Sequence, residues 1–134
     1  MTPERLYLDS SAIVKLIVRE AESPALARRL GLRPLLVSSV LAQVEVVRSL
    51  ARAGRPASIL RLAGRVLDDI GLRRIDNTII RLAQSLEPPD LRSLDAIHLA
   101  TALSFGPRLN GMIAYDARLA QSATSAGLAV ESPM

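Results

Sequence analysis

The side chains of this chain that could do chemistry are mainly carboxylates, because the sequence has no cysteine and only one histidine. Four acids interrupt or directly follow apolar runs: Asp9, Glu45, Asp95 and Asp116. Oxygen ligands of this kind suit Mg²⁺ or Mn²⁺ and argue against zinc. Such a cation can activate a water as the nucleophile and stabilise a leaving oxygen. If the four acids meet, they favour metal-dependent hydrolysis of a phosphodiester in a polyanion.

Asp9 and Asp116 occupy the same kind of place in the sequence. Each follows a short apolar stretch, at 6–8 and 112–115, and each precedes a helical pattern. Ligand sites of parallel sheets lie outside the carboxyl ends of the strands, so both side chains can reach one rim. The alternative for each aspartate is a helix cap. The two serines after Asp9 could cap that helix equally well and leave Asp9 free.

Asp95 and Glu45 are expected on helices. Asp95 falls in the first turn of a helix that is apolar nearly all round, so this helix should be buried and its acid should face a cleft. The alternative for Asp95 is a purely structural carboxylate favoured by the helix dipole. Glu45 lies at the edge of an apolar stripe, where the alternative is a surface ion pair with Arg48.

His98 follows Asp95 by three positions, so the two side chains can be neighbours on one helix face. The imidazole could orient that carboxylate or act as an acid–base group. The alternative is a plain structural role.

The elements that must position these residues alternate along the chain. Strands are expected at 6–8, 34–38, 72–75, 112–115 and 128–130, and helices at 12–17, 24–30, 41–53, 59–70, 78–86, 94–104 and 118–125. Serines at 23, 39 and 93, and the Asp76–Asn77 pair, are the expected helix caps. Alternating strands and helices predict an α/β fold with a mostly parallel sheet. The length fits a single domain, 1–134.

The charge balance bears on the partner. The net charge is +4, and Lys15 is the only lysine, so the cationic side chains are almost all arginines. Arginine pairs bidentately with phosphate, which favours a nucleic-acid partner. The alternative is the codon bias of a GC-rich genome. Aromatic residues make up only 2%, which argues against a base-stacking platform.

Hydropathy bears on assembly and location. Hydrophobic residues make up 49% of the chain and its mean hydropathy is +0.26. We therefore expect a partner or a second copy to cover some apolar surface. No apolar run reaches the roughly 18 residues of a membrane helix, and the N-terminus lacks the pattern of a secretory signal. The expected location is cytoplasmic.

Four stretches of the sequence resemble the motifs of the PIN-domain nucleases. They are LDSSA at 8–12, the isolated Glu45 after two serines at 38–39, LDAIHLATA at 94–102 and YDARL at 115–119. The resemblance runs from residue 6 to residue 133. Within the family the chain is most similar to the VapC toxins of bacterial VapBC toxin–antitoxin pairs.

This resemblance implies a three-layer fold with a four- or five-stranded parallel sheet and a Mg²⁺- or Mn²⁺-dependent endoribonuclease. It implies that Asp9, Glu45, Asp95 and Asp116 form the acidic metal site. It also implies a small hydroxyl residue nearby, matched by Ser10 or Ser11. The implied partners are RNA and a VapB-like antitoxin, in a homodimer that forms a heterotetramer or larger assembly with the antitoxin.

One position departs from the family pattern, since Ala114 stands where many relatives have threonine. This change removes a hydroxyl near Asp116 but leaves the carboxylate. Two other functions fit the fold: a housekeeping PIN nuclease for RNA maturation, and a non-catalytic nucleic-acid-binding module. The presence of all four acids argues against the second.

Overall fold

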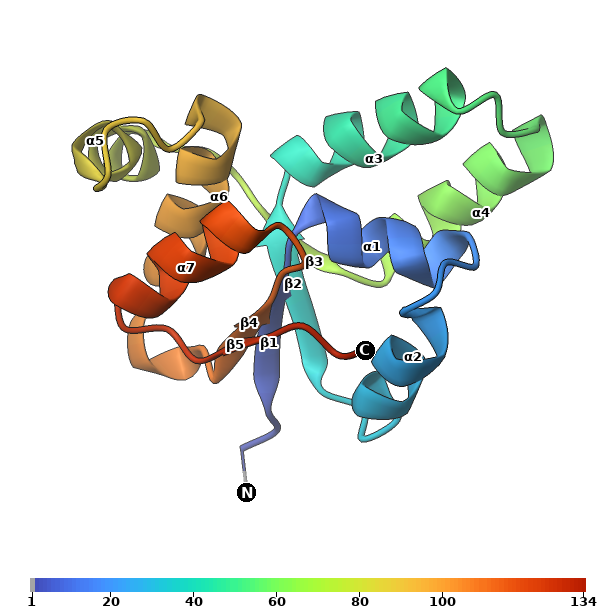
Figure 1. Ribbon diagram of the computed structural model, residues 1–134, viewed down its shortest axis with the longest axis horizontal. Helices are drawn as coiled ribbons and strands as arrows, with labels where there is room; N and C mark the ends of the chain where they lie inside the picture. The colour runs from blue at the N-terminus through green and yellow to red at the C-terminus, as the bar shows by residue number, and fades with distance from the viewer. Residues whose placement is uncertain (1) are drawn as a thin grey trace.

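A parallel sheet runs through the middle of the protein, and helices cover both of its faces (Figure 1). The computed structural model describes residues 2–134, in which the sheet has five strands in the order β3-β2-β1-β4-β5. Every neighbouring pair is parallel. The strands are β1 (Arg5–Leu8), β2 (Leu35–Ser39), β3 (Gly71–Arg73), β4 (Gly111–Ile113) and β5 (Val130–Glu131). The predicted α/β class with a parallel sheet is confirmed.

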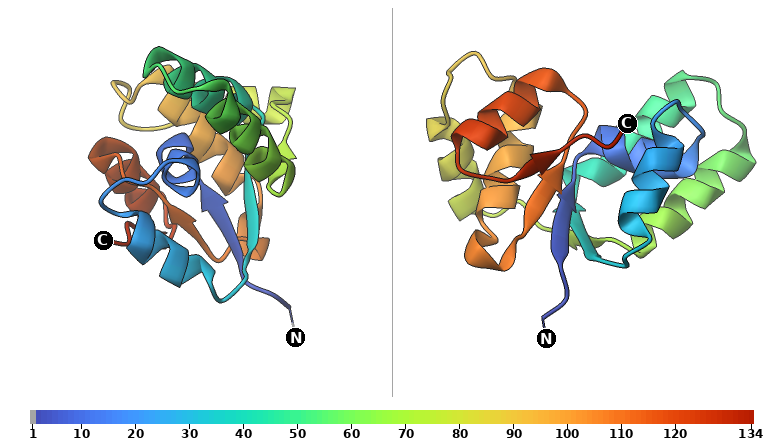
Figure 2. Two further views of the ribbon diagram at one scale, coloured as in Figure 1. Left: turned by 90° about the vertical axis from the view of Figure 1, so that its right-hand side faces the viewer. Right: turned by 60° about the horizontal axis from the view of Figure 1, so that its bottom comes forward.

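The helices form two outer layers. Figure 1 shows α1 to α4 on one side of the sheet and α5 to α7 on the other, and the rotated views in Figure 2 keep this division. Their bounds are α1 (Ser10–Ile17), α2 (Ser23–Leu30), α3 (Leu41–Arg52), α4 (Ala57–Asp68), α5 (Asn77–Ser85), α6 (Ser93–Leu103) and α7 (Ala117–Ser125), with a short 3₁₀ turn η1 (Gly106–Arg108). The resulting arrangement has three layers.

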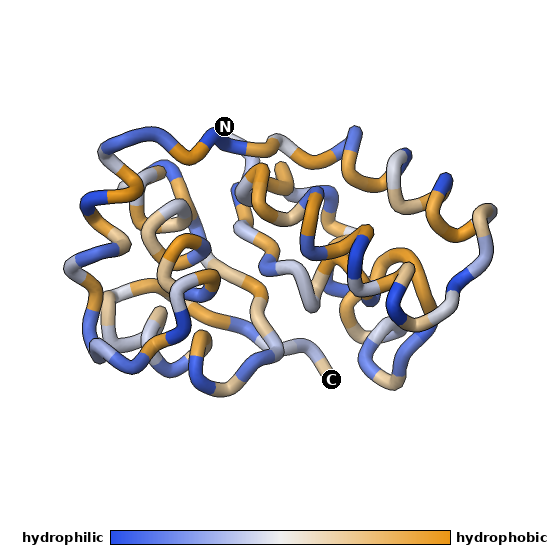
Figure 3. The backbone as a smooth tube through the Cα atoms, turned by 90° about the horizontal axis from the view of Figure 1, so that it is seen from above, coloured by the Kyte–Doolittle hydropathy of each residue, from blue (hydrophilic) through white to orange (hydrophobic). Residues whose placement is uncertain are grey.

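The central strand explains why the sheet is buried on both faces. Leu6 and Leu8 of β1 pack into the cluster under α1 to α4, whereas Tyr7 packs into the cluster under α6 and α7. Successive side chains of a strand point to opposite faces, so a strand covered on both sides must be apolar throughout. The helices are two-sided instead, and Figure 3 shows hydrophobic and hydrophilic stretches alternating along them.

The strand order places a switch point between β1 and β4. The chain moves outward from β1 through β2 to β3, and then returns to place β4 on the other side of β1. The backbone N–H of Asp9 donates to the carbonyl of Ile113 at 3.1 Å, which joins the ends of these two strands. Crevices at such switch points are the usual ligand sites of open α/β sheets.

Helix starts differ in part from the predictions. Asp9, Asp76 and Asp116 each cap a helix by accepting a backbone N–H, from Ala12, Ile79 and Leu119 respectively. The prediction for Asp76 is confirmed, and Asp9 itself takes the cap that its serine neighbours could have taken. The Ser39 hydroxyl accepts the N–H of Leu41 at 3.1 Å, although Val40 is the cap residue.

Two predicted serine caps are wrong. Ser23 is already the first residue of α2, and its hydroxyl donates to the carbonyl of Lys15 at 2.8 Å. Ser93 is the first residue of α6, and Arg92 occupies the cap position without a capping hydrogen bond. In both cases the helix begins one residue earlier than the pattern predicted.

A charged group ties the two chain ends to α2. The guanidinium of Arg29 donates to both carboxylate oxygens of Glu4, at 3.0 and 2.8 Å, and to both of Glu131, at 2.7 and 2.8 Å. These contacts join the segment before β1 to β5 through one side chain. Within residues 2–134, no helix has the length and apolar character needed to cross a membrane.

Candidate active site

Asp9 lies at the centre of the switch point and is almost fully buried, with 3% of its surface exposed. Its Oδ1 accepts the N–H of Ala12 at 2.9 Å and the hydroxyl of Ser11 at 2.7 Å. Burial raises the pKa of the Asp9 carboxyl, and these hydrogen bonds only partly offset that effect. Asp9 is therefore both a helix cap and a rigidly held carboxylate.

Glu45 reaches the same region from α3. Its Oε1 accepts the Ser10 hydroxyl at 2.6 Å and lies 2.5 Å from Nε2 of His98. Burial alone would raise the pKa of Glu45, but the hydrogen bonds from His98 and Ser10 outweigh it, so the pKa lies below its usual value. The alternative of a surface ion pair with Arg48 is wrong, because Glu45 points inward to His98.

His98 is buried, with 2% of its surface exposed, and both ring nitrogens have partners. The Tyr7 hydroxyl lies 2.6 Å from Nδ1, and Nε2 faces Glu45. An ionised carboxylate only accepts, so the neutral ring must carry its proton on Nε2 and accept the Tyr7 O–H at Nδ1. Burial raises the pKa of Tyr7 far above its usual range, so this tyrosine remains a donor. Tyr7, His98 and Glu45 thus form one hydrogen-bonded chain.

Arg92 joins the other two acids. Its guanidinium lies 2.9 Å from Oδ2 of Asp95, and its Nη2 lies 3.3 Å from Oδ2 of Asp116. The pKa of Arg92 is raised, first by Asp95 and then by the charges of Asp116 and Glu45. The negative charges of Asp95, Asp116 and Glu45 therefore all stabilise the charged form of this exposed guanidinium.

The site can be tested for its fit to a divalent cation. Within residues 2–134, no three acidic or histidine side chains stand close enough together to hold a metal as they are. However, Asp95 and Asp116 already share one cationic nitrogen of Arg92, and the backbone hydrogen bond from Asp9 to Ile113 ties Asp9 to the end of β4, three residues before Asp116. The donors are all carboxylate oxygens, the ligands that Mg²⁺ and Mn²⁺ prefer. The donor chemistry therefore fits such a cation, and binding it requires that Arg92 moves aside and that the acids draw closer together.

A cleft of about 540 Å³ leads away from Glu45 between α1 and α3. Its lining is part apolar and part basic, with Val44 and Leu94 beside Arg48 and Arg52. Val44 is 56% exposed and Leu94 is 48% exposed, so both apolar side chains are open to a partner. The cleft offers cations and apolar surface next to the acidic site.

The structure brings the predicted residues together in three sets. Glu45 and Ser10 meet His98, Asp9 is held by Ser11 and the start of α1, and Asp95 and Asp116 meet at Arg92. His98 contacts Glu45, not Asp95, although Asp95 is its neighbour on the helix. Ala114 has no side-chain hydroxyl, unlike the threonine of many relatives. Its backbone carbonyl accepts a hydrogen bond from the Ser132 hydroxyl.

Sequence reasoning missed two residues of the site, Tyr7 and Arg92. Tyr7 stands two positions before Asp9 as one of only three aromatic residues, and Arg92 stands three positions before Asp95. The spacing of Arg92 and Asp95 is that of a helical ion pair, which was a readable signal. The contact between Tyr7 and His98 joins residues 91 positions apart, and no local pattern predicts it.

The sequence is similar to known proteins over nearly its whole length. A model of the PIN domain family matches residues 6–125. Ribonuclease VapC46 of Mycobacterium tuberculosis is 50% identical over 129 residues, covering 96% of this chain and 97% of the relative. Ribonuclease VapC47 of the same species is 36% identical over 132 residues, covering 96% of each chain.

Solved structures show the same fold. Mycobacterium tuberculosis VapC20, described as a sarcin–ricin loop cleaving toxin, aligns with a TM-score of 0.74 at 17% identity, covering 96% of this chain and 99% of its own. A toxin–antitoxin complex from Klebsiella pneumoniae aligns with a TM-score of 0.69 at 18% identity, covering 96% and 98%. The chain therefore belongs to the PIN-domain family, among its VapC proteins.

Proposed function

We propose that this protein is a Mg²⁺- or Mn²⁺-dependent endoribonuclease, the toxin of a toxin–antitoxin pair, built as a single PIN domain. The observation that carries the proposal is the convergence of Asp95 and Asp116 on one cationic nitrogen, beside the buried Asp9. The names of the curated VapC relatives, which are ribonucleases, support RNA as the substrate.

The cation would be held by Asp9, Glu45, Asp95 and Asp116. When bound, it supplies Lewis-acid activation of a water and neutralises charge on the phosphodiester. Ser11 and the start of α1 hold Oδ1 of Asp9 in one orientation. Binding a cation at the other carboxylate oxygen would therefore cost little conformational entropy.

Glu45 is kept ionised and aimed by two donors. His98 holds it from one side and Ser10 from the other, while Tyr7 fixes the tautomer of the imidazole. We assign His98 and Tyr7 a positioning role, because neither side chain is open to a substrate. Arg92 is exposed and can turn from the acids toward a phosphate once a cation replaces it.

The partners follow from the surface and the relatives. The arginines beside the cleft suit the RNA backbone, and the exposed apolar residues suit a protein partner. We propose a homodimer whose remaining apolar surface is covered by a VapB-like antitoxin, in a heterotetramer or larger assembly. The solved toxin–antitoxin complex supports a partner of this kind.

RNA cleavage by the purified protein, free of any antitoxin, tests the activity. Structured RNA should be cut with Mg²⁺ or Mn²⁺ and should remain intact with EDTA. Asp95→Asn should abolish cleavage, whereas Asp68→Asn, an exposed aspartate at the end of α4, should cut as the parent does. Full activity of Asp95→Asn would show that the site assignment is wrong.

Light scattering tests the assembly. The protein should be a dimer at tens of micromolar, and co-expression with its antitoxin should increase its solubility. A monomer whose solubility does not change on co-expression would contradict the proposed partners.

A further inference from the structure

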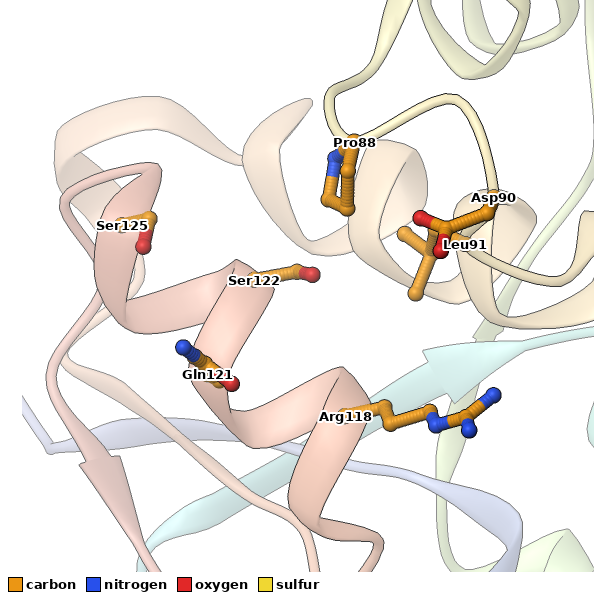
Figure 4. A pocket seen from close by; sticks show the side chains of 7 residues that line it. All are labelled: Pro88, Asp90, Leu91, Arg118, Gln121, Ser122 and Ser125. Atoms are coloured by element: carbon orange, nitrogen blue, oxygen red, sulfur yellow. The ribbon is translucent and has the colours of Figure 1, made fainter.

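A second cavity lies beside the acidic site, between the segment 88–91 and α7 (Figure 4). Its volume is about 300 Å³. The lining combines apolar and polar side chains, from Pro88, Asp90, Leu91, Arg118, Gln121, Ser122 and Ser125. The last four are spaced along one face of α7, since they stand at positions i, i+3, i+4 and i+7.

The polar side chains of this pocket have no protein partners. Within residues 2–134, none of the five forms a hydrogen bond or an ion pair with another side chain or with the backbone. Ser122 is only 7% exposed, yet no enclosed polar atom of the described chain lacks a partner, so its hydroxyl must open into the cavity. Figure 4 shows Ser122 and Arg118 directed from α7 toward the segment that carries Asp90. A hydroxyl that is open to the cavity and has no protein partner is free to bond a group that enters the cavity.

Both walls of the pocket lead along the chain into residues of the acidic site. The segment 88–91 leads directly into Arg92, and α7 begins directly after Asp116. The ion pair between Arg92 and Asp116, at 3.3 Å, connects the two walls at that end. A ligand in the pocket would therefore lie next to a phosphodiester held at the acids.

The lining matches the chemistry of a nucleobase. Pro88 and Leu91 offer apolar surface to a ring, while the amide of Gln121 and the hydroxyl of Ser122 can each donate and accept. Asp90 accepts only, so it favours a base edge that carries N–H donors. Arg118 can bind a base acceptor or the adjoining phosphate. Proteins that read RNA sequence do so mainly on unstacked bases of single-stranded loops.

We propose that this pocket is a subsite for one unstacked nucleobase of the RNA, adjacent to the bond that is cut, which makes it a determinant of cleavage specificity. This inference rests on the proposed ribonuclease function. It adds that Asp90, Gln121 and Ser122 recognise one base next to the cleaved bond and so set the base preference there. None of the three belongs to the acidic site.

Sequencing the RNA ends produced from a random-sequence RNA pool tests the subsite, with the full chain and Mn²⁺. The parent should prefer one base at one position beside the cut. Gln121→Ala and Ser122→Ala should each weaken that preference by about two- to tenfold, the value of one hydrogen bond. Asp90→Asn should change which base is preferred, because an amide donates as well as accepts.

The matched control is Thr124→Ala. Thr124 lies on α7 but outside the pocket, and its hydroxyl donates to the carbonyl of Ala120 at 2.8 Å, so its base preference should equal that of the parent. If the parent cuts RNA and all three pocket variants keep its base preference, the subsite is refuted while the ribonuclease function stands. If the parent cuts no RNA, the proposed ribonuclease function is refuted, and so is the subsite that depends on it.

Thermal melting tests whether the Ser122 hydroxyl serves the fold instead of a ligand. Ser122→Ala should melt at the same temperature as the parent, because the Ser122 hydroxyl opens into the cavity and the fold loses no hydrogen bond with it. A clear loss of stability in Ser122→Ala would show that the hydroxyl serves the fold, and would overturn its place in the subsite.

Discussion

The Nη2 atom of Arg92 lies 3.3 Å from Oδ2 of Asp116, although the two residues come from different elements. The same guanidinium also holds Asp95, at 2.9 Å. An arginine of the chain itself therefore neutralises two acids that the proposed cation would need. Metal binding and the Arg92 contacts must compete for the same oxygens.

Replacing Arg92 by glutamine should strengthen metal binding. In EDTA, Arg92→Gln should melt at a lower temperature than the parent, because Asp95 and Asp116 lose the charge that neutralises them. With Mg²⁺ its melting temperature should rise by more than that of the parent, since a ligand that binds only the native state stabilises it by mass action. Arg81→Gln, on an exposed position of α5, is the control. An equal Mg²⁺ shift in Arg92→Gln and the parent would show that no competition exists.

The buried Asp9 should hold its proton more tightly than an aspartate of the unfolded chain when no metal is present. Burial raises its folded pKa, so its contribution to stability is present at low pH and is lost as pH rises through the folded value. Asparagine keeps an oxygen for the N–H of Ala12 and is as good a helix cap as aspartate. Asp9→Asn in EDTA at pH 7 should therefore be as stable as the parent or more so, and should lose the Mg²⁺ stabilisation.

Asp9→Ala separates the cap from the charge. Without any acceptor at the start of α1, this variant should lose about 0.5–2 kcal/mol of stability in EDTA, and like Asp9→Asn it should gain nothing from Mg²⁺. Chemical denaturation of both variants in EDTA measures the difference. Equal losses in Asp9→Asn and Asp9→Ala would mean that the charged carboxylate itself stabilises the metal-free fold.

His98 should be needed for both stability and activity. His98→Leu fills a similar volume but removes the shared partner of Tyr7 and Glu45, and the buried Tyr7 hydroxyl left without it should cost about 1–3 kcal/mol. RNA cleavage should fall as well, because Glu45 loses one of the two donors that aim it. Ile97→Leu, at the neighbouring position of α6, should preserve both. A stable and fully active His98→Leu would contradict the positioning role.

The hydrogen bonds from Arg29 to Glu4 and Glu131, far from the acidic site, should make a pH-dependent contribution to the free energy of unfolding. Hydrogen bonds from Arg29 lower the pKa of Glu4. A lowered carboxyl pKa stabilises the fold above the unfolded value, about 4.3, and this stabilisation is lost as pH falls through the folded value.

Urea unfolding of Arg29→Met measures that contribution. At pH 7 the loss should be on the order of 1 kcal/mol, because these carboxylates are partly exposed and screened by solvent. The difference in unfolding free energy between Arg29→Met and the parent should become smaller as the pH falls below about 4. The control is Arg28→Met, an exposed neighbour on the same helix. A loss that stays constant from pH 7 to pH 3 would mean that lost packing, and not charge, causes it.

Much of the fold could be predicted from local patterns. The apolar runs at 6–8 and 112–115 predicted two strands ending in aspartates, and those strands are neighbours in the sheet. The difficult points were those where two signals compete. Ser23 and Ser93 are good caps by type, but each helix begins at the serine itself, and the Ser23 hydroxyl bonds the backbone of α1 instead.

The site was predictable as a set of residue types and less so as a set of contacts. Acids in apolar surroundings indicated Asp9, Glu45, Asp95 and Asp116, but the partner of each depends on how distant elements pack. Glu45 could have paired with Arg48 on its own helix, yet the structure directs it to His98, 53 positions away. Such contacts are tertiary, and no spacing along the chain encodes them.

Calorimetric titration with Mn²⁺ tests most directly whether the four acids form one metal site. The parent should bind Mn²⁺, and Asp9→Asn, Glu45→Gln, Asp95→Asn and Asp116→Asn should each bind it at least about tenfold more weakly, a loss of roughly 1.4 kcal/mol. Asp68→Asn should bind as the parent does. If the four site variants all bind Mn²⁺ with the parent's affinity, the acids do not form a metal site and the proposed mechanism is wrong.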